Sequence, residues 1–227
     1  MSQSITHARP MAFFDFDGTL TQGDTLMPFL RFIVGTPAYY AKLSWLGPVL
    51  AAYHIGLLRN DIAKQIVLKR YLAGYSTAEL FTQGQRFSAE VIPTMLRPEG
   101  MERLKWHLAQ DHECVLVSAS LDVYLTPWAQ QAGFSQVVCT SLAQDANGRV
   151  TGYIAGRNCY GEEKARRIAP LIKSAAPPAT YAYGDTRGDL PMLQLVDTGL
   201  MRCSGGKPRF SSDTNTAHWQ RVPNAKS

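Results

Sequence analysis

The stretch that most constrains the fold is MAFFDFDGTLT, from Met11 to Thr21. It begins with an apolar run, which is typical of a buried strand. Asp15 and Asp17 follow, and Gly18 then permits a tight turn. Ligands of open α/β sheets bind at the carboxyl ends of the strands. The stretch therefore predicts a strand that delivers two carboxylates to a binding site. The simpler alternative is a strand that ends in ordinary turn aspartates.

The composition predicts a globular protein with one large domain, or a core with an insert. The chain has 227 residues, of which 45% are hydrophobic and 18% charged, so a sizeable core can form. The 23 basic and 18 acidic residues give a net charge of +5, which favours anionic partners such as phosphorylated substrates or acidic lipid headgroups. No basic run with interleaved aromatic residues occurs, so we expect no nucleic-acid partner.

The cysteines and the start of the chain favour a cytoplasmic protein. Cys114, Cys139, Cys159 and Cys203 are scattered, without C-x-x-C or zinc spacing. We expect buried free thiols in a reducing compartment, although the sequence leaves a disulfide pair open. Residues 1–10 are polar and contain no apolar segment of the kind found in a secretory signal.

From about residue 97 onward, strand patterns alternate with helix patterns. Apolar runs at 113–117, 136–140, 180–183 and 199–203 predict strands, and 98–110, 122–132, 161–174 and 188–195 predict helices. Asn147-Gly148 predicts a hairpin turn. This alternation indicates a mostly parallel sheet with right-handed crossovers, and hence a Rossmann-like, three-layer α/β core.

Between the first strand and this region, the sequence predicts a helical insert. We expect the catalytic core at residues 10–22 and 97–210, an all-helical cap at 23–96 and a C-terminal tail at 211–227, which wraps the surface or frays. The segment 43–58 has no formal charge and is too short for a comfortable membrane span. Gly47-Pro48 also interrupts it, which argues against one continuous helix.

Two interpretations of the apolar insert remain open. It forms either a buried helical pair or a cap whose apolar surface touches lipid or an acyl chain. Aromatic and flanking basic residues fit an interfacial belt and fit a core equally well: Tyr39, Tyr40, Trp45 and Tyr53, with Lys42 and Arg59.

Four polar groups occur at the ends of predicted elements. They are the Asp15-to-Thr19 turn, Ser118 after a strand, Lys164 near a helix start, and Gly184-Asp185-Thr186-Arg187-Gly188-Asp189 after another strand. Taken singly, Ser118 is typical of a helix cap, Lys164 of a solvated surface, and Asp185 and Asp189 of a turn and a cap. Their combination in this chain order is much harder to explain by chance.

In this combination, the four groups resemble the motifs of the haloacid dehalogenase superfamily. The likeness is to its phosphoserine-phosphatase-like branch, in which a helical cap follows the first motif, and it spans about residues 9–210. It implies a phosphatase that uses Mg²⁺, which prefers hard oxygen ligands. The resemblance further implies metal contacts from Asp15, Asp185, Asp189 and the backbone carbonyl of Asp17.

The same resemblance implies a role for each polar residue. Asp15 attacks phosphorus to form an aspartyl-phosphate, and Asp17 serves as general acid and then base. Lys164 acts in catalysis and in phosphate binding. The other predicted phosphate-binding residues are Gly18, Thr19, Ser118 and Ala119.

Two departures from the branch leave the substrate open. Gly18 and, approximately, Asp24 stand where phosphoserine phosphatases usually carry serine and glutamate, and Arg187-Gly188 replaces a small residue and asparagine. Arg187 adds a phosphate contact or forms a surface salt bridge.

We expect a small phosphorylated metabolite as substrate. The apolar insert ending in LLRND and the motif from Asn158 to Lys164 are similar to bacterial phosphatidylglycerophosphatases, which makes a lipid phosphate at the inner membrane face the alternative. A phosphomutase and a non-catalytic phosphate- or magnesium-binding domain are further alternatives. The sequence leaves the oligomeric state open.

Overall fold

The computed structural model describes residues 8–202 and 219–224. Within them lies a six-stranded sheet with the order β3-β2-β1-β6-β7-β8, in which only the β7–β8 pair is antiparallel. Its strands are β1 (Met11–Phe14), β2 (Glu113–Leu121), β3 (Gln136–Thr140), β6 (Thr180–Gly184), β7 (Thr198–Arg202) and β8 (Trp219–Val222). A separate antiparallel hairpin consists of β4 (Leu142–Gln144) and β5 (Val150–Ile154). The predicted Rossmann-like, mostly parallel sheet is confirmed.

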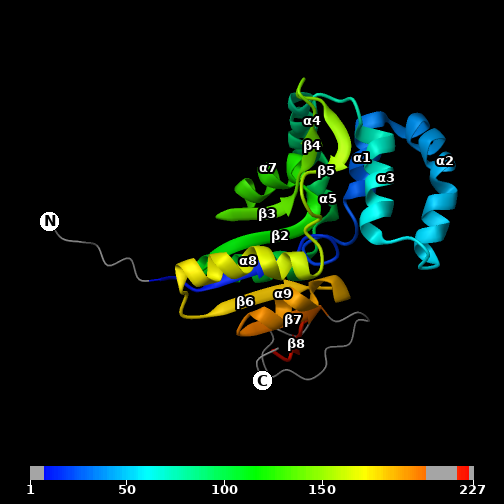
Figure 1. Cartoon of the computed structure of the whole chain (residues 1–227). Helices are drawn as coiled ribbons and strands as arrows, with labels where there is room; N and C mark the ends of the chain where they lie inside the picture. The colour runs from blue at the N-terminus through cyan, green and yellow to red at the C-terminus, as the bar shows by residue number, and fades with distance from the viewer. Residues whose placement is uncertain (1–7, 203–218, 225–227) are drawn as a thin grey trace.

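Helices occupy most of the connections between these strands (Figure 1). They are α1 (Leu26–Val34), α2 (Thr36–His54), α3 (Asn60–Leu72), α4 (Thr77–Glu90), α5 (Ile92–Met95), α6 (Pro98–Ala109), α7 (Asp122–Ala132), α8 (Glu162–Ala175) and α9 (Leu190–Leu195), with a 3₁₀ turn, η1 (Arg187–Asp189), before α9.

The alternation of side chains along β1 produces two cores, one on each face of the sheet. Ala12 and Phe14 belong to the larger core, which α6, α7 and the helices after β1 complete. Met11 and Phe13 belong to the smaller core, which α8 and α9 cover. All four β1 side chains are buried, so the strand that precedes Asp15 is fixed on both faces.

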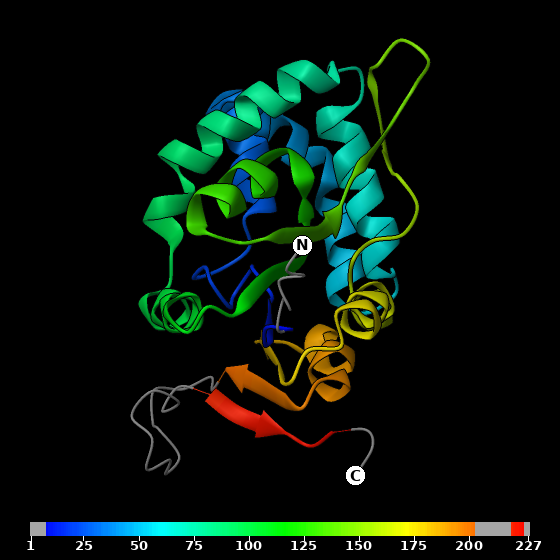
Figure 2. The ribbon, with the colours of Figure 1, turned by 90° about the vertical axis from the view of Figure 1, so that its left-hand side faces the viewer.

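Helices α1 to α5 connect β1 to α6, where the cap was expected. Figures 1 and 2 show α2 and α3 beyond the carboxyl ends of the strands. The hairpin β4–β5 belongs to the predicted core segment by sequence, yet β5 packs against α3. A Cβ atom at Gly152 would lie 2.3 Å from Lys69 Cα, so this close approach depends on glycine.

The prediction that Gly47 and Pro48 interrupt the helix is wrong, because α2 continues unbroken through both residues. A proline inside a helix leaves the carbonyl four residues earlier without its usual hydrogen bond. Here that residue is Ser44, and Ser44 and Pro48 are both exposed, so water can satisfy the carbonyl. The insert is also not a buried helical pair, because much of α2 is exposed.

Two further expectations are corrected at strand ends. The second strand does not stop before Ser118 but continues to Leu121. The predicted C-terminal tail, 211–227, contains β8, although 211–218 and 225–227 lie outside the described residues, as does Cys203. The strand forms because Trp219 and Val222 are buried, with the Trp219 ring edge-on to Tyr183 at 5.0 Å.

The remaining predictions about elements are largely confirmed. Asn147-Gly148 joins β4 to β5. Of the described cysteines, Cys114, Cys139 and Cys159 are free thiols, and burial raises the pKa of Cys114 to about 12. None of the helices in the described ranges combines the length and hydrophobicity that crossing a bilayer requires.

A buried polar chain connects α6 to the sheet and predicts how stability depends on pH. Arg103 Nε donates to Tyr183 Oη at 2.6 Å, and His107 contacts Tyr183 through Nε2 at 2.8 Å and His112 through Nδ1 at 2.7 Å. Burial, followed by the charge of Arg103, lowers the pKa of His107 to about 3.

A histidine with a depressed pKa in the folded state favours folding above its unfolded pKa of about 6.5. This contribution is lost as the pH falls from about 6.5 toward 3. We expect His107 to reduce the free energy of unfolding by about 2 kcal/mol between pH 7.5 and pH 5. Urea unfolding of the wild type and of His107→Gln at both values measures this, because the difference between their pH profiles isolates His107. Parallel profiles would contradict the assignment.

Candidate active site

A cavity of about 310 Å³ lies between the carboxyl ends of the strands and the helices after β1. The sheet side contributes the polar residues Asp15, Asp17, Ser118, Lys164 and Asp189. The helical side contributes a largely apolar wall of Leu26, Met27, Tyr53, Ala63 and Val67. The cavity therefore joins a charged floor to an apolar wall.

Asp15 occupies the centre of the floor because β1 is the central strand. Its backbone N–H continues the ladder to β6 by donating to Tyr183 O at 2.9 Å. Thr19 Oγ1 donates to Asp15 Oδ2 at 3.0 Å, so the turn after the strand orients the carboxylate. Burial and then the charge of Asp189 raise the pKa of Asp15 to about 8, although Lys164 opposes this shift.

Lys164 joins two of the predicted motifs. Its Nζ lies 2.5 Å from Asp15 Oδ1 and 2.6 Å from Asp189 Oδ1, and all three side chains are almost fully buried. Burial alone would lower the pKa of Lys164, but the two carboxylates raise it above the ordinary value. The interpretation of Lys164 as a solvated surface lysine is therefore wrong.

Asp189 organises the turn after β6. Its Oδ2 accepts from Thr186 N and Thr186 Oγ1, each at 3.0 Å, and from Asp185 N at 3.2 Å. Thr186 and Asp189 form a capping box for η1. Asp189 therefore acts as a cap, which is the role that its sequence position alone suggested, and it also binds Lys164.

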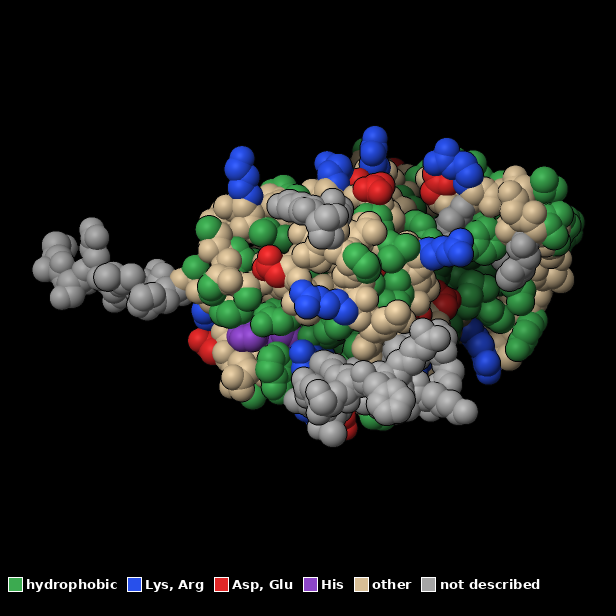
Figure 3. All heavy atoms as spheres, turned by 90° about the horizontal axis from the view of Figure 1, so that it is seen from below, with side chains coloured by type: hydrophobic (Ala, Val, Ile, Leu, Met, Phe, Trp, Pro, Cys, Tyr) green, Lys and Arg blue, Asp and Glu red, His purple; other side chains and the backbone are tan. Residues whose placement is uncertain are grey.

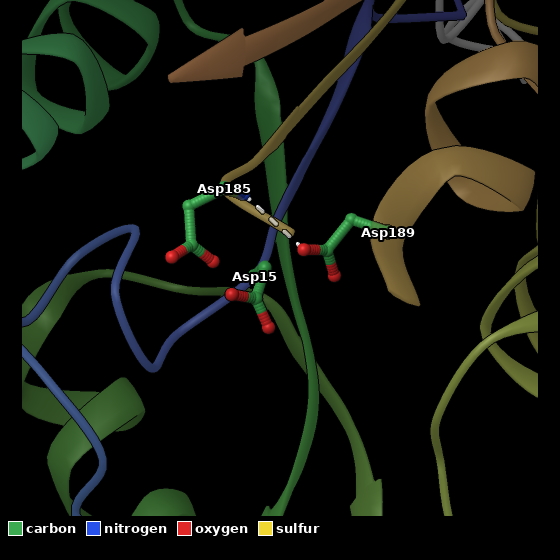
Figure 4. A group of neighbouring side chains, drawn as sticks. All are labelled: Asp15, Asp185 and Asp189. Carbon is green, nitrogen blue, oxygen red and sulfur yellow. Dashed lines mark hydrogen bonds between the residues drawn. The ribbon is translucent and has the colours of Figure 1, made fainter. Parts of the chain in front are cut away.

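Carboxylate oxygens of Asp15, Asp185 and Asp189 all lie within 4.8 Å of one another. Figure 4 shows the three side chains converging from the ends of β1 and β6 and from the turn before α9. Burial and then Asp189 raise the pKa of Asp185, as expected for carboxylates crowded away from water. A cation would relieve this repulsion, and an all-oxygen donor set suits Mg²⁺. The residues therefore fit the magnesium ion that the motifs imply.

The carboxylate of Asp17 is not part of this group. Its Oδ1 accepts from Thr25 N at 2.8 Å and Thr25 Oγ1 at 2.6 Å, and its Oδ2 accepts from Ser120 Oγ at 2.5 Å. Burial and then the charge of Asp24 raise the pKa of Asp17 to about 6. A carboxyl group that titrates near neutrality is suited to proton transfer.

The predicted phosphate-binding residues divide into two sets. Ser118 and Ala119 line the cavity, and Ser118 Oγ accepts from Ser120 N at 3.0 Å. Gly18 and Thr19 do not line it. Thr19 is fully buried behind Asp15, and Arg202 Nε donates to Gly18 O at 2.9 Å. Arg187 is exposed on η1.

Lys64 was not among the predicted site residues, yet it reaches the cavity from α3. Its Nζ donates to Ala119 O and, at 3.0 Å, to Asn158 Oδ1. Burial lowers the pKa of Lys64 to about 8. One signal was available, because Lys64 lies one helical turn from Val67 and Leu68 on the buried face of α3.

Thr25, Ser120 and Asn158 were also missed as site residues, because each contacts a residue distant in the sequence. Asn158 belongs to the motif before Lys164, and its Oδ1 accepts from both Lys64 and Thr140. Tyr160 lines the same cavity, and its ring lies so close to Gly188 that a Cβ there would be 2.3 Å from Cε2. No local pattern in the sequence predicts these contacts.

Crowded carboxylates, a buried lysine and a second aspartate at the carboxyl edge of a Rossmann-like sheet are the kinds of group that phosphoryl transfer uses. The model for haloacid dehalogenase-like hydrolases matches residues 12–194, and the chain belongs to this family. Protein CicA of Caulobacter vibrioides is 31% identical over 208 residues, which cover 92% of each chain.

Other comparisons indicate the branch of the family. Phosphoserine phosphatase SerB1 of Mycobacterium tuberculosis is 27% identical over 83% of this chain and 63% of its own length. A Bordetella pertussis crystal structure shares 27% identity over 83% of this chain and 87% of that one, with a TM-score of 0.71. A substrate-bound phosphoserine phosphatase complex shares the fold, with a TM-score of 0.61 and 17% identity over 85% and 84% of the two chains. The protein is a phosphoric monoester phosphatase of the phosphoserine-phosphatase-like branch.

Gly18 provides a test of the metal-binding geometry. Its φ is +83°, and an added Cβ would lie 2.1 Å from Asp185 Oδ2. We expect Gly18→Ala to displace the Asp185 carboxylate and weaken Mg²⁺ binding at least about tenfold, as measured by titration calorimetry. Gly23→Ala is the matched control, since a Cβ at Gly23 meets nothing within 4 Å. Equal Mg²⁺ affinity in the two variants would refute this geometric role.

Proposed function

We propose that the protein hydrolyses phosphate monoesters through an aspartyl-phosphate intermediate, with Asp15 as nucleophile. The observation that carries the proposal is the buried ion pair between Lys164 and Asp15, beside the separately bonded Asp17. This arrangement holds one carboxylate next to a fixed cation and a second one ready to transfer a proton. It supports turnover rather than a passive phosphate-binding role.

In the proposed first step, Asp15 attacks phosphorus and the bond to the leaving oxygen breaks. The second carboxylate oxygen of Asp15 is held by Thr19 Oγ1, which limits rotation of the side chain. Lys164 and Ser118 bind the phosphoryl oxygens. The positive charge of Lys164 and the hydrogen bond from Ser118 stabilise the negative charge that spreads over these oxygens.

Asp17 transfers the proton in both steps. The protonated carboxyl group gives its proton to the leaving oxygen, and the resulting carboxylate then takes a proton from the water that attacks the aspartyl-phosphate. A pKa raised to about 6 by burial is compatible with both roles. Thr25 and Ser120 hold the carboxyl group in one orientation throughout.

The cofactor we propose is Mg²⁺, held by Asp15, Asp185 and the backbone carbonyl of Asp17, with Asp189 supporting the site. When bound, it supplies the positive charge that lets an anionic carboxylate approach a phosphate dianion. Asp189 fixes the turn that carries Asp185, through its bonds to the backbone of Asp185 and Thr186.

The substrate we propose is a small phosphorylated metabolite that the protein meets in the cytoplasm. A lipid phosphate is the second candidate, and the apolar wall of Leu26, Met27, Tyr53, Ala63 and Val67 favours it. A screen of phosphorylated metabolites together with a short-chain phosphatidylglycerophosphate, ranked by kcat/KM, separates the two. Product analysis with an acceptor alcohol separates hydrolysis from transfer by a mutase.

Substitution of the two aspartates tests the mechanism. We expect Asp15→Asn to abolish hydrolysis of p-nitrophenyl phosphate, since no nucleophile remains. Asp17→Asn should reduce kcat about 10²–10⁴-fold and let the phosphorylated enzyme accumulate, which mass spectrometry after acid quench detects. Asp111→Asn, at an exposed site outside the cavity, should retain full activity. Wild-type turnover by Asp15→Asn would exclude the mechanism.

Removal of divalent cations tests the cofactor. We expect a chelator to abolish hydrolysis and added Mg²⁺ to restore it. Asp185→Asn should raise the Mg²⁺ concentration for half-maximal activity at least about tenfold, because one charged ligand becomes neutral. Asp145→Asn serves as the control, since Asp145 lies in the β4–β5 turn. Full activity in the presence of chelator would overturn the assignment of Mg²⁺.

A further inference from the structure

Helix α2 exposes apolar side chains that its own fold does not cover. We define the outer face as Tyr40 and Trp45 of α2 together with Ile55 and Leu57 of the turn that follows. Trp45 is 78% exposed, Ile55 71% and Leu57 79%. Single exposed apolar residues are ordinary on protein surfaces, but a set of large ones on one helix and its turn indicates a binding surface.

This face is also free of acidic charge. From Thr25 to Asn60 the chain contains no Asp or Glu, whereas Arg31, Lys42 and Arg59 carry positive charge. Figure 3 shows hydrophobic side chains gathered at the end of the molecule that α2 forms, with basic side chains nearby. The first acidic residue after α2 is Asp61, and it is paired with Arg59 at 2.9 Å.

The cation within α2 does not interrupt the face. Lys42 is half-buried, and its Nζ lies 5.6 Å from the centre of the Tyr71 ring, on α3. Tyr39 and Leu46 are buried on the same inner side of α2. Helix α2 therefore directs its one formal charge and part of its apolar surface toward α3, and it still leaves Tyr40 and Trp45 in solvent.

We propose that the outer face docks on the surface of an anionic phospholipid membrane. Trp and Tyr side chains favour the interface between headgroups and acyl chains, and exposed aliphatic side chains such as Ile55 and Leu57 can enter the acyl region. The neighbouring Arg31 attracts acidic headgroups. The net charge of +5 adds to this attraction.

The same charges argue against a second copy of the chain as the occupant. Pairing two outer faces would bring the Arg31 side chains of both copies together, and no acidic residue occurs between residues 25 and 60 to pair with them. An acidic bilayer, by contrast, supplies the missing negative charge and an apolar interior.

Docking in this orientation would bring the active-site cavity to the membrane. Tyr53 lines the cavity, and Ile55 of the outer face follows it two residues later, so the outer face ends close to the cavity. The membrane contact itself stands independently of the catalytic mechanism. Its use for hydrolysis of a phosphate carried on a membrane-borne molecule rests on the proposed function.

Cosedimentation with lipid vesicles tests the proposal. The full chain is mixed with phosphatidylcholine vesicles that contain or lack phosphatidylglycerol. We expect the protein to sediment with the anionic vesicles, and less so at high salt, where screening weakens charge attraction. The double variant Trp45→Glu, Leu57→Glu should lower the partition coefficient at least about tenfold. Tyr153→Glu on β5, an exposed aromatic outside the outer face, is the matched control and should bind as the wild type does.

Activity and mass measurements keep the outcomes distinct. All variants should hydrolyse p-nitrophenyl phosphate equally without vesicles, because the substituted residues lie outside the active site. Absence of binding to anionic vesicles, or equal binding by the double variant, would overturn the proposal. A wild-type dimer that the double variant converts to a monomer, without vesicle binding, would overturn it in favour of self-association. Vesicle binding by a protein without phosphatase activity would retain the docking surface and reject the proposed function.

Discussion

The placement of Lys164 between Asp15 and Asp189 is the interaction on which the site depends. Three carboxylates meet at one edge of a buried sheet, and burial together with mutual repulsion raises the pKa of Asp15 and Asp185. A buried charge is costly unless it is paired and hydrogen-bonded. The ammonium group at 2.5 Å and 2.6 Å from two of these carboxylates provides that pairing.

The parallel sheet explains how motifs that are far apart along the chain meet at this site. Asp15 ends β1, Asp185 follows β6, and Lys164 lies in the first turn of α8. Parallel strands bring their carboxyl ends to one edge, and α8 packs on the face of the sheet that carries Met11 and Phe13. Residues far apart in sequence therefore reach one another without any long loop.

The parts that the sequence predicted well are those governed by local patterns. The apolar run before Asp15 predicts β1, and Asn147-Gly148 predicts the hairpin. The start of α1 is also determined locally, since Asp24 Oδ2 accepts from Met27 N. Contacts within a few residues determine the hairpin turn and the helix start, whereas β1 is predictable from its apolar run although its partner strands, β2 and β6, are distant in the sequence.

The errors occurred where distant contacts or solvent decide the structure. Residues 219–222 are half polar, and they form a strand because Trp219 packs on Tyr183. Pro48 is tolerated inside α2 because that side of the helix is exposed. In α3, Ile62 and Ile66 are exposed although they are strongly hydrophobic, since neighbouring elements rather than hydrophobicity determine which side of the helix is covered.

The loop after β6 shows how unevenly the chain tolerates change at adjacent positions. Arg187 is exposed, so the space around it leaves room for most side chains. Gly188, the next residue, lies under the end of the exposed Tyr160 ring, so any larger side chain there requires the ring to move. A randomised library of this loop would therefore recover most diversity at the first position, and side chains at the second position would go together with a displaced Tyr160 ring. Because Tyr160 lines the cavity and Arg187 does not, substitutions at Gly188 reshape the cavity wall through this ring, whereas substitutions at Arg187 do not.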